Sequence, residues 1–151
     1  MNIILEGCDC TGKSTIAKYL CEQLGLYYWH ESEPRSLEEY RQMLSSGGVV
    51  FDRFCFGQFV YNSPEERKLS EEELKQLIQE FKSTQSLLLF VDAPSDLIFK
   101  RMVERGEVNE SNQTEAIKWI KNIRGTYRQI FRESGAEYIE LNGEKALCLI
   151  I

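Results

Sequence analysis

Near its amino terminus the sequence reads Gly7-Cys8-Asp9-Cys10-Thr11-Gly12-Lys13-Ser14-Thr15. This stretch fits the phosphate-binding pattern of Gly, any four residues, then Gly-Lys-Ser/Thr. It follows the apolar run Ile3-Ile4-Leu5 and precedes a helical stretch at residues 16–20, so a strand, a loop and a helix are expected in that order. We therefore predict a loop whose backbone N–H groups, together with the following helix N-terminus, bind the phosphates of a nucleotide.

The residue types inside this loop predict separate roles. Gly7 and Gly12 permit backbone conformations that are closed to other residues. Lys13 is expected to reach the β- and γ-phosphates of ATP, and the Ser14 hydroxyl is expected to bind Mg²⁺. The predicted nucleotide-binding set is Gly7, Cys8, Asp9, Cys10, Thr11, Gly12, Lys13, Ser14 and Thr15.

Composition limits the classes of partner. The chain has 151 residues, enough for one domain, here 1–151, with a sizeable buried core. Its formal net charge is −6 and it has no Lys/Arg block, so a nucleic-acid partner is not expected. No signal peptide and no membrane-spanning apolar run is evident, and the five cysteines are scattered. These features favour a cytoplasmic protein with reduced thiols and no membrane partner.

Cysteine and histidine residues often bind metals or act in catalysis, but their placement in this sequence does not support either role. Cys8 and Cys10 have no second Cys or His pair at ligand spacing, so we interpret them as loop residues. His30 is the only histidine, and we interpret it as a strand-end side chain rather than a catalyst.

Hydrophobic periodicity divides the chain into alternating strands and helices. Strands are expected at 2–6, 26–30, 49–51, 87–91 and 138–141, and helices at 13–24, 36–45, 54–61, 70–82, 95–105 and 114–133. Ser70 with Glu73 forms a capping-box pattern at the start of its helix. The alternation predicts an α/β fold: a single three-layer domain with a five-stranded parallel sheet and helices on both faces.

Several polar residues fall where predicted strands end. They are the phosphate loop, Glu33, Asp52-Arg53 and Asp92. Ligands of such sheets bind beyond the carboxyl ends of the strands, so these residues are expected to converge. Asp52 and Asp92 are both candidates for a Mg²⁺ site, and the sequence does not separate them. Asp92 also suits a different role, as a cap for the helix that follows.

Phosphoryl transfer needs cations beyond Lys13 to neutralise charge on the moving group. Arg53 is placed to bind an acceptor phosphate through its bidentate guanidinium. Arg101 and Arg105 are four residues apart and share one helix face that leads into a loop, as in a lid around 101–112 that closes on a nucleotide. The alternative for this arginine pair is a solvated helix face paired with neighbouring glutamates.

Residues 5–15, Leu-Glu-Gly-Cys-Asp-Cys-Thr-Gly-Lys-Ser-Thr, resemble the phosphate loop of thymidylate kinases, P-loop nucleotide kinases whose loop carries an acidic residue that contacts the acceptor sugar. Asp52-Arg53-Phe54 followed by Tyr61 is similar to that family's Asp-Arg-aromatic motif, whose arginine binds the acceptor phosphate. Glu33-Pro34 is similar to its Arg-Glu-Pro segment. The acceptor-binding residues implied by the resemblance are Asp9, Glu33, Arg53, Phe54 and Tyr61.

The resemblance extends to the lid, where Arg101 and Arg105 precede Gly106. Cys10 stands where some members of the family carry a catalytic arginine, so the resemblance assigns that duty to Arg101 or Arg105. Ser32 replaces the arginine of the Arg-Glu-Pro segment, and only residues 35–51 separate Pro34 from Asp52, where the family has a longer segment that recognises the base. The resemblance also implies a homodimer.

Three functions remain open from the sequence. The first is ATP- and Mg²⁺-dependent phosphoryl transfer to a deoxynucleoside monophosphate, dTMP or a related pyrimidine, in nucleotide biosynthesis. The second is a deoxynucleoside kinase in which Glu33 acts as base toward the sugar 5′-hydroxyl; Asp52-Arg53, rather than Glu-Arg, argues for the first. The third is a nucleotide-binding module with no acceptor.

Overall fold

Five parallel strands form one sheet in the order β2-β3-β1-β4-β5. The structure is a computed structural model and describes residues 1–150. The strands are β1 (Asn2–Glu6), β2 (Tyr27–His30), β3 (Val49–Asp52), β4 (Ser86–Asp92) and β5 (Ile139–Asn142). The phosphate-binding loop therefore leaves the central strand, with β3 and β4 on either side of it.

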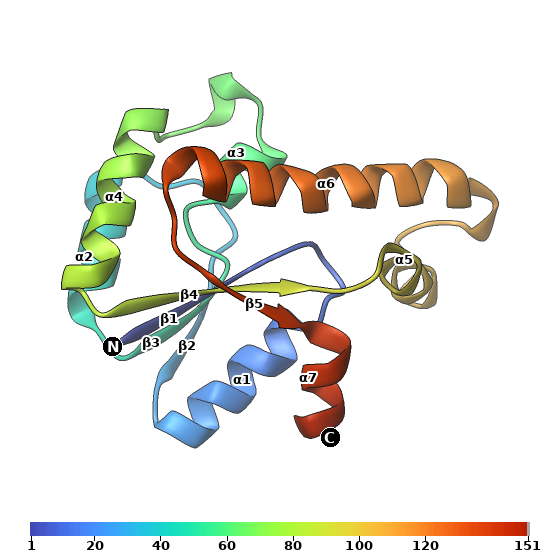
Figure 1. Cartoon of the computed structure of the whole chain (residues 1–151), viewed down its shortest axis with the longest axis horizontal. Helices are drawn as coiled ribbons and strands as arrows, with labels where there is room; N and C mark the ends of the chain where they lie inside the picture. Colours follow the sequence, from blue (N-terminus) through green and yellow to red (C-terminus); the bar gives the residue numbers. More distant parts are fainter. Residues whose placement is uncertain (151) are drawn as a thin grey trace.

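Helices cover both faces of the sheet. They are α1 (Lys13–Leu24), α2 (Leu37–Ser46), α3 (Gly57–Tyr61), α4 (Glu71–Ser83), α5 (Ser95–Glu104), α6 (Gln113–Ser134) and α7 (Gly143–Ile150), with short 3₁₀ turns η1 (Pro64–Glu66) and η2 (Glu110–Asn112). Figure 1 shows α1 and α7 on one side of the sheet and α6 on the other. The predicted three-layer α/β fold is confirmed.

Neighbouring residues of the central strands point to opposite faces, and both faces are apolar. One core cluster contains Ile4, Phe51, Leu88 and Phe90, and packs against α2, α4 and α6. The other contains Ile3, Leu5, Val50, Leu89 and Val91, and packs against α1 and α7. Because burial on both faces fixes the strands, the loops at their carboxyl ends are held by a rigid frame.

Most helix boundaries follow the sequence signals. Gly25 ends α1 in the left-handed conformation, and Ser70 forms a capping box with Glu73 at the start of α4. The predicted helix at 54–61 begins only at Gly57, because Arg53 adopts a positive φ of 73° and the chain must turn before a helix can start. The segment between β3 and α3, which contains Arg53, is therefore a turn rather than part of a helix or strand.

Helix α7 lies beyond the elements expected from the sequence and packs against the phosphate-binding loop. A Cβ atom on Gly143 would lie 1.9 Å from the carbonyl oxygen of Thr11, so backbone meets backbone there. Leu147 of the same helix covers Gly12. Helix α7 therefore supports the loop at Thr11 and Gly12.

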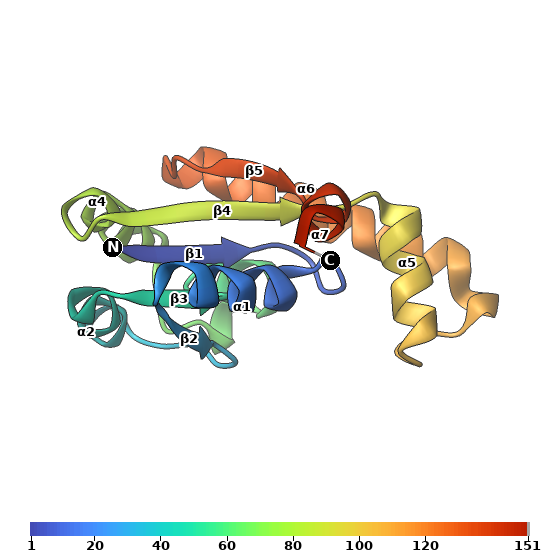
Figure 2. The same ribbon diagram turned by 90° about the horizontal axis from the view of Figure 1, so that it is seen from below.

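Helix α5 stands beyond the carboxyl ends of the strands, as Figure 2 shows, and packs against α6. Its last turn and residues 105–112 form the segment expected to act as a lid. Among residues 1–150, no helix is both long enough and apolar enough to cross a membrane.

Candidate active site

The loop at residues 7–12 has the backbone shape of a phosphate cradle. Gly7 has a φ of 146°, and a Cβ atom there would lie 2.1 Å from the carbonyl oxygen of Val91. Gly12 has a φ of 99° and caps α1, and no side-chain hydrogen bond caps the N–H groups of the first turn. These free donors, at the positive end of the helix dipole, suit an anion.

Lys13 is folded back onto the loop. Its side chain is buried, and Nζ donates to the Cys8 carbonyl oxygen at 2.5 Å. Burial lowers the pKa of Lys13 to about 8, and nearby Arg53 adds to this, while Asp9 and Asp52 oppose it. A phosphate bound in the loop would offer this ammonium a charged partner that the carbonyl does not provide.

Three side chains converge on one oxygen of Asp52. Ser14 Oγ donates to Oδ2 at 2.5 Å and Tyr28 Oη donates to it at 2.6 Å, while His30 Nδ1 lies 3.3 Å away. Burial alone would raise the pKa of Asp52, but the hydrogen bonds and the charge of Lys13 hold it below its usual value. Asp52 is thus an ionised carboxylate in contact with the phosphate-loop serine.

Asp92 has a different set of partners. Arg124 donates to Oδ1 and Oδ2 at 2.8 and 2.9 Å, and Arg128 donates to Oδ2 at 2.7 Å. Both oxygens are therefore occupied by arginines of α6, which lower its pKa despite its burial. The Mg²⁺ role expected for Asp92 stays a prediction. Its expected role as a helix cap is wrong, since Pro94 is the N-cap of α5 and no side-chain hydrogen bond caps that helix.

Arg53 is held from several sides at the end of β3. Its backbone N–H donates to the Leu5 carbonyl at 2.9 Å, and its φ of 73° turns the side chain toward the loop. Nη1 donates to Tyr127 Oη at 3.0 Å, Nη2 pairs with Asp9, and the guanidinium lies 4.9 Å from the ring centre of Tyr61. A non-glycine residue with positive φ beside a cavity is typical of a functional site.

A pocket of about 340 Å³ opens beside this arginine. Its lining includes all the residues expected to bind an acceptor, namely Asp9, Glu33, Arg53, Phe54 and Tyr61. The two aromatic residues differ, because Phe54 is buried in the core and packs on Phe51 and Tyr40, whereas Tyr61 is partly exposed. The structure therefore brings these five residues together.

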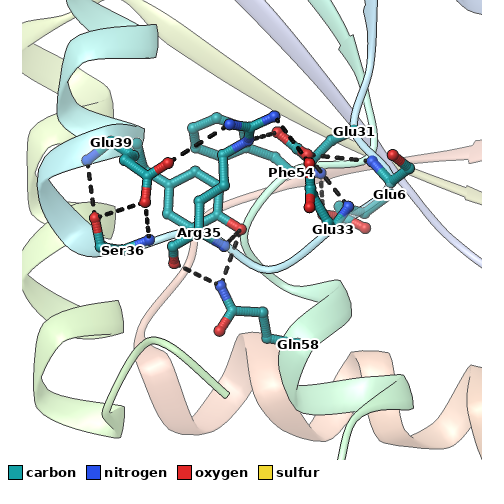
Figure 3. Close-up of polar contacts among 10 residues, drawn as sticks. Glu6, Glu31, Glu33, Arg35, Ser36, Glu39, Phe54 and Gln58 are labelled. Carbon is teal, nitrogen blue, oxygen red and sulfur yellow. Dashed lines mark hydrogen bonds and ion pairs between the residues drawn. The ribbon is translucent and has the colours of Figure 1, made fainter. Parts of the chain in front are cut away.

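The structure buries a carboxylate that the sequence analysis passed over. Glu31 is 3% exposed, and its oxygens accept from Arg35 Nε at 2.7 Å and from the backbone N–H groups of Ser32 and Glu33. Glu33 is 70% exposed and lies only near Arg35, at 4.0 Å. Figure 3 shows the Arg35 side chain with Glu39 on one side and with Glu31 and Glu33 on the other. Glu31 directly follows β2, and this strand-end position was the sequence signal that could have identified it as a candidate site residue.

A buried amide fixes the wall of the pocket. Gln58 Nε2 donates to Arg35 O and to Tyr40 Oη, both at 2.9 Å, and its Oε1 accepts from the N–H groups of Lys68 and Leu69. Gln58 thereby joins α2, α3 and the loop before α4; Figure 3 shows its contact with Arg35. With these partners in place, the amide shapes the pocket and does not have to bind a ligand.

The lid arginines occupy different positions. Arg101 Nη1 donates to the Cys10 carbonyl oxygen at 2.9 Å, so this side chain already contacts the loop. Arg105 is exposed and lies 4.0 Å from Glu107. Cys8 and Cys10 are free, buried thiols, and burial raises the pKa of Cys8 to about 11. Thr11 Oγ1 donates a hydrogen bond to the Cys8 carbonyl oxygen, while Thr15 is exposed to solvent.

No family model matches the sequence. Over 143 residues the chain is 25% identical to the SPbeta prophage-derived protein YorR of Bacillus subtilis (strain 168), a match that covers 88% of this chain and 83% of YorR. The crystal structure of YorR in complex with phosphorylated GDP has a TM-score of 0.79 and 24% identity, and the match covers 99% of this chain and 95% of YorR.

Two solved kinases are also similar in structure. Deoxyadenosine kinase from M. mycoides with bound dCTP has a TM-score of 0.59 at 15% identity, covering 95% of this chain and 91% of the kinase. Shikimate kinase from Acinetobacter baumannii in complex with shikimate has a TM-score of 0.58 at 20% identity, covering 99% and 92%. This chain has the P-loop kinase fold. The likeness does not single out thymidylate kinases.

Proposed function

We propose that this chain is an ATP- and Mg²⁺-dependent kinase that transfers the γ-phosphoryl group to a deoxynucleoside monophosphate, dTMP or a related pyrimidine nucleotide. The position of Arg53 carries the proposal. Its guanidinium lines the pocket and also pairs with Asp9 of the phosphate-binding loop, so one cation faces both halves of the site. An acceptor phosphate is a better bidentate partner for an arginine than an exposed aspartate.

The residues of the loop fit the phosphates of ATP. Gly7 and Gly12 adopt positive-φ backbone turns in which a Cβ atom would collide with the Val91 carbonyl oxygen or the Leu147 side chain, and the N-terminus of α1 has no side-chain cap. Bound there, ATP supplies the phosphoryl group. Lys13 and Arg101 now donate to the carbonyl oxygens of Cys8 and Cys10, and both would move a short way to bind phosphate oxygens instead.

The residues also fit Mg²⁺. Ser14 Oγ and the Asp52 carboxylate lie together at the loop, whereas residues 1–150 contain no cluster of three or more His, Cys, Asp or Glu side chains that would hold a metal alone. Mg²⁺ is commonly held by one or two protein oxygens with substrate phosphates and water. When bound, the ion neutralises phosphate charge.

The chain's own residues then have defined tasks. Arg53 holds the acceptor phosphate in line with the loop, and Lys13 with Arg101 stabilises the charge that spreads over the moving group. Arg105, exposed on the lid, is free to turn inward when the lid closes. Closure excludes water, which is the competing acceptor. A homodimer remains part of the proposal through the resemblance alone.

A second candidate is a deoxynucleoside kinase, which the buried Glu31 favours. The pocket carries the carboxylates of Asp9, Glu31 and Glu33 but only one arginine, Arg53. A neutral acceptor with a hydroxyl group fits such a lining without adding negative charge. In that reaction Glu31, rather than the exposed Glu33, would accept the hydroxyl proton.

The deciding experiment measures nucleoside diphosphate release from ATP or GTP with Mg²⁺. The acceptor panel contains each deoxynucleoside monophosphate, each deoxynucleoside and no acceptor, with products identified by mass. Guanine nucleotides belong in the panel because YorR was crystallised with phosphorylated GDP. Turnover limited to a monophosphate supports the first candidate, and turnover limited to a nucleoside supports the second. Hydrolysis without any acceptor preference would contradict both.

Matched variants assign the roles. For a monophosphate acceptor, Arg53→Ala should raise the acceptor KM about tenfold or more while the KM for ATP stays near normal. Arg41→Ala is the control, because Arg41 pairs with Glu80 on the surface of α2 and α4, away from the pocket. For a nucleoside acceptor, Glu31→Gln should depress kcat far more than Glu33→Gln.

A further inference from the structure

A buried tyrosine of α6 joins two strand ends of the candidate site. The Tyr127 side chain is buried, and its hydroxyl meets Glu6 at the end of β1 and Arg53 at the end of β3. Tyr127 Oη lies 3.1 Å from Glu6 Oε2 and 3.0 Å from Arg53 Nη1. The three side chains come from three separate elements of the sheet and its covering layer.

The chemistry of the partners fixes the direction of these hydrogen bonds. An ionised Glu6 can only accept, and its other oxygen already accepts from the Phe54 N–H at 2.8 Å. Arg53 can only donate. The Tyr127 hydroxyl therefore donates a hydrogen bond to Glu6 and accepts one from Arg53 through a lone pair of its oxygen. Because the hydroxyl hydrogen of Tyr127 points to Glu6, the Arg53 guanidinium contacts the lone-pair side of the hydroxyl oxygen.

Arg53 is bound unequally on its two sides. One amino group meets the buried Tyr127, and the other meets Asp9, whose side chain is 52% exposed. A ligand phosphate entering the pocket can displace the exposed partner but cannot reach the buried one. The guanidinium would thus keep its orientation while its outer face changes partner.

We propose that Tyr127, backed by Glu6, is a positioning residue that holds the Arg53 guanidinium toward the acceptor pocket. The inference rests on the proposed kinase function and adds to it two residues that contact neither nucleotide. Phe131, one turn further along α6, packs in the same aromatic cluster without a polar atom. A phenylalanine at 127 would therefore suffice for packing, and the hydroxyl needs a separate reason.

The energetic cost of burying the Glu6 carboxylate supports a functional role for its contact with Tyr127. Glu6 is fully buried, and burial raises its pKa while Arg53 opposes the rise. A buried carboxylate destabilises a core unless its partners satisfy it. Here those partners are a backbone N–H of the Asp-Arg-aromatic turn and the tyrosine that holds Arg53, so the carboxylate is devoted to the residues around one arginine.

The test compares two tyrosine-to-phenylalanine variants in the full chain. Tyr127→Phe should raise the KM of the acceptor identified by the panel about tenfold, leaving the KM for ATP within about twofold. Tyr138→Phe is the matched control, because Tyr138 packs on Phe131 in the same cluster and has no side-chain hydrogen bond among residues 1–150. The control should leave both constants unchanged.

Equal effects of Tyr127→Phe on both substrates, or none, would overturn the positioning role. A second measurement does not need turnover, and its only variant, Arg53→Lys, keeps the positive charge and serves for assignment. In wild-type protein, NMR of the arginine side chains should show Arg53 with slowly rotating, hydrogen-bonded amino groups, assigned by their loss in Arg53→Lys. A freely rotating Arg53 overturns the inference, whereas an absence of acceptor turnover with a fixed Arg53 overturns only the proposed function.

Discussion

Asp52 and Asp92 end the two strands that flank β1, and they look alike until their partners are compared. Both are buried, and both have a lowered pKa. Asp52 is held by hydroxyl groups, one of them from the phosphate-loop Ser14, whereas Asp92 is held by two arginines. Hydroxyl donors leave the carboxylate charge available to a cation, but arginines neutralise it. Two strand-end carboxylates thus differ in the charge of their neighbours, and this difference is the reason that we propose Asp52 rather than Asp92 as a Mg²⁺ ligand.

The largest expected difference is in turnover. Asp52→Asn should lower kcat about a hundredfold or more, because a neutral amide binds Mg²⁺ weakly and transition-state charge is left without compensation. Asp92→Asn should leave the kcat of the folded protein near wild type. Steady-state kinetics at saturating Mg²⁺ check both variants. A comparable loss in Asp92→Asn would place that residue in the reaction and remove the contrast.

Stability should show the opposite order. Asp92→Asn leaves Arg124 and Arg128 without their shared carboxylate, and because these arginines are partly exposed the free energy of unfolding should fall by about 2 kcal/mol. Denaturant melts measure this loss. Asp52→Asn keeps hydrogen-bonding groups opposite Ser14 and Tyr28 and should cost less. If Asp52→Asn proves the less stable variant, Asp52 is mainly a structural residue.

The pH dependence of ATP use sharpens the comparison further. Lys13 is a cation below its pKa of about 8, so kcat/KM for ATP should fall as the pH rises through that value. Asp52 helps to keep the proton on Lys13. Asp52→Asn should therefore lower this pKa and move the alkaline fall to lower pH, whereas Asp92→Asn should leave it in place. A shift in the opposite direction would show that another group controls the profile.

The smallest effect is expected for a partner of Asp52. Tyr28→Phe removes one hydrogen bond to Oδ2 and should weaken the apparent Mg²⁺ affinity a few-fold, with little change in kcat at saturating Mg²⁺. A Mg²⁺ titration of activity measures it. Tyr27→Phe is the control, since Tyr27 is 79% exposed on the same strand. Identical titrations for the two variants would mean that Tyr28 does not orient Asp52.

The fold could be predicted because its signals are local. Gly25, the capping box at Ser70 and the apolar run at 87–91 each mark a boundary within a few residues. The convergence of Asp9, Arg53 and Glu33 on one pocket also followed from the expected parallel sheet, since parallel strands bring their carboxyl ends to one edge. Local patterning and one topological rule account for this part.

The remaining features depend on contacts that periodicity does not encode. The pairing of Asp92 with Arg124 and Arg128 and the contact of Tyr127 with Glu6 are set by how α6 is rotated on the sheet. The choice between Glu31 and Glu33 depends on a turn after β2. Glu31 and Glu33 are two residues apart and would share one face of an extended chain, so residue type and periodicity do not decide which of them is buried.

Helix α7 makes the packing of the candidate nucleotide site depend on a segment that is translated late. Residues 7–12 are translated before Gly143 and Leu147, yet the backbone that lies against Thr11 belongs to Gly143 and the side chain that covers Gly12 belongs to Leu147. Domains assemble as their segments are translated. The loop therefore lacks its contacts with α7 until nearly the whole of the described chain has been synthesised, although β1 is already present.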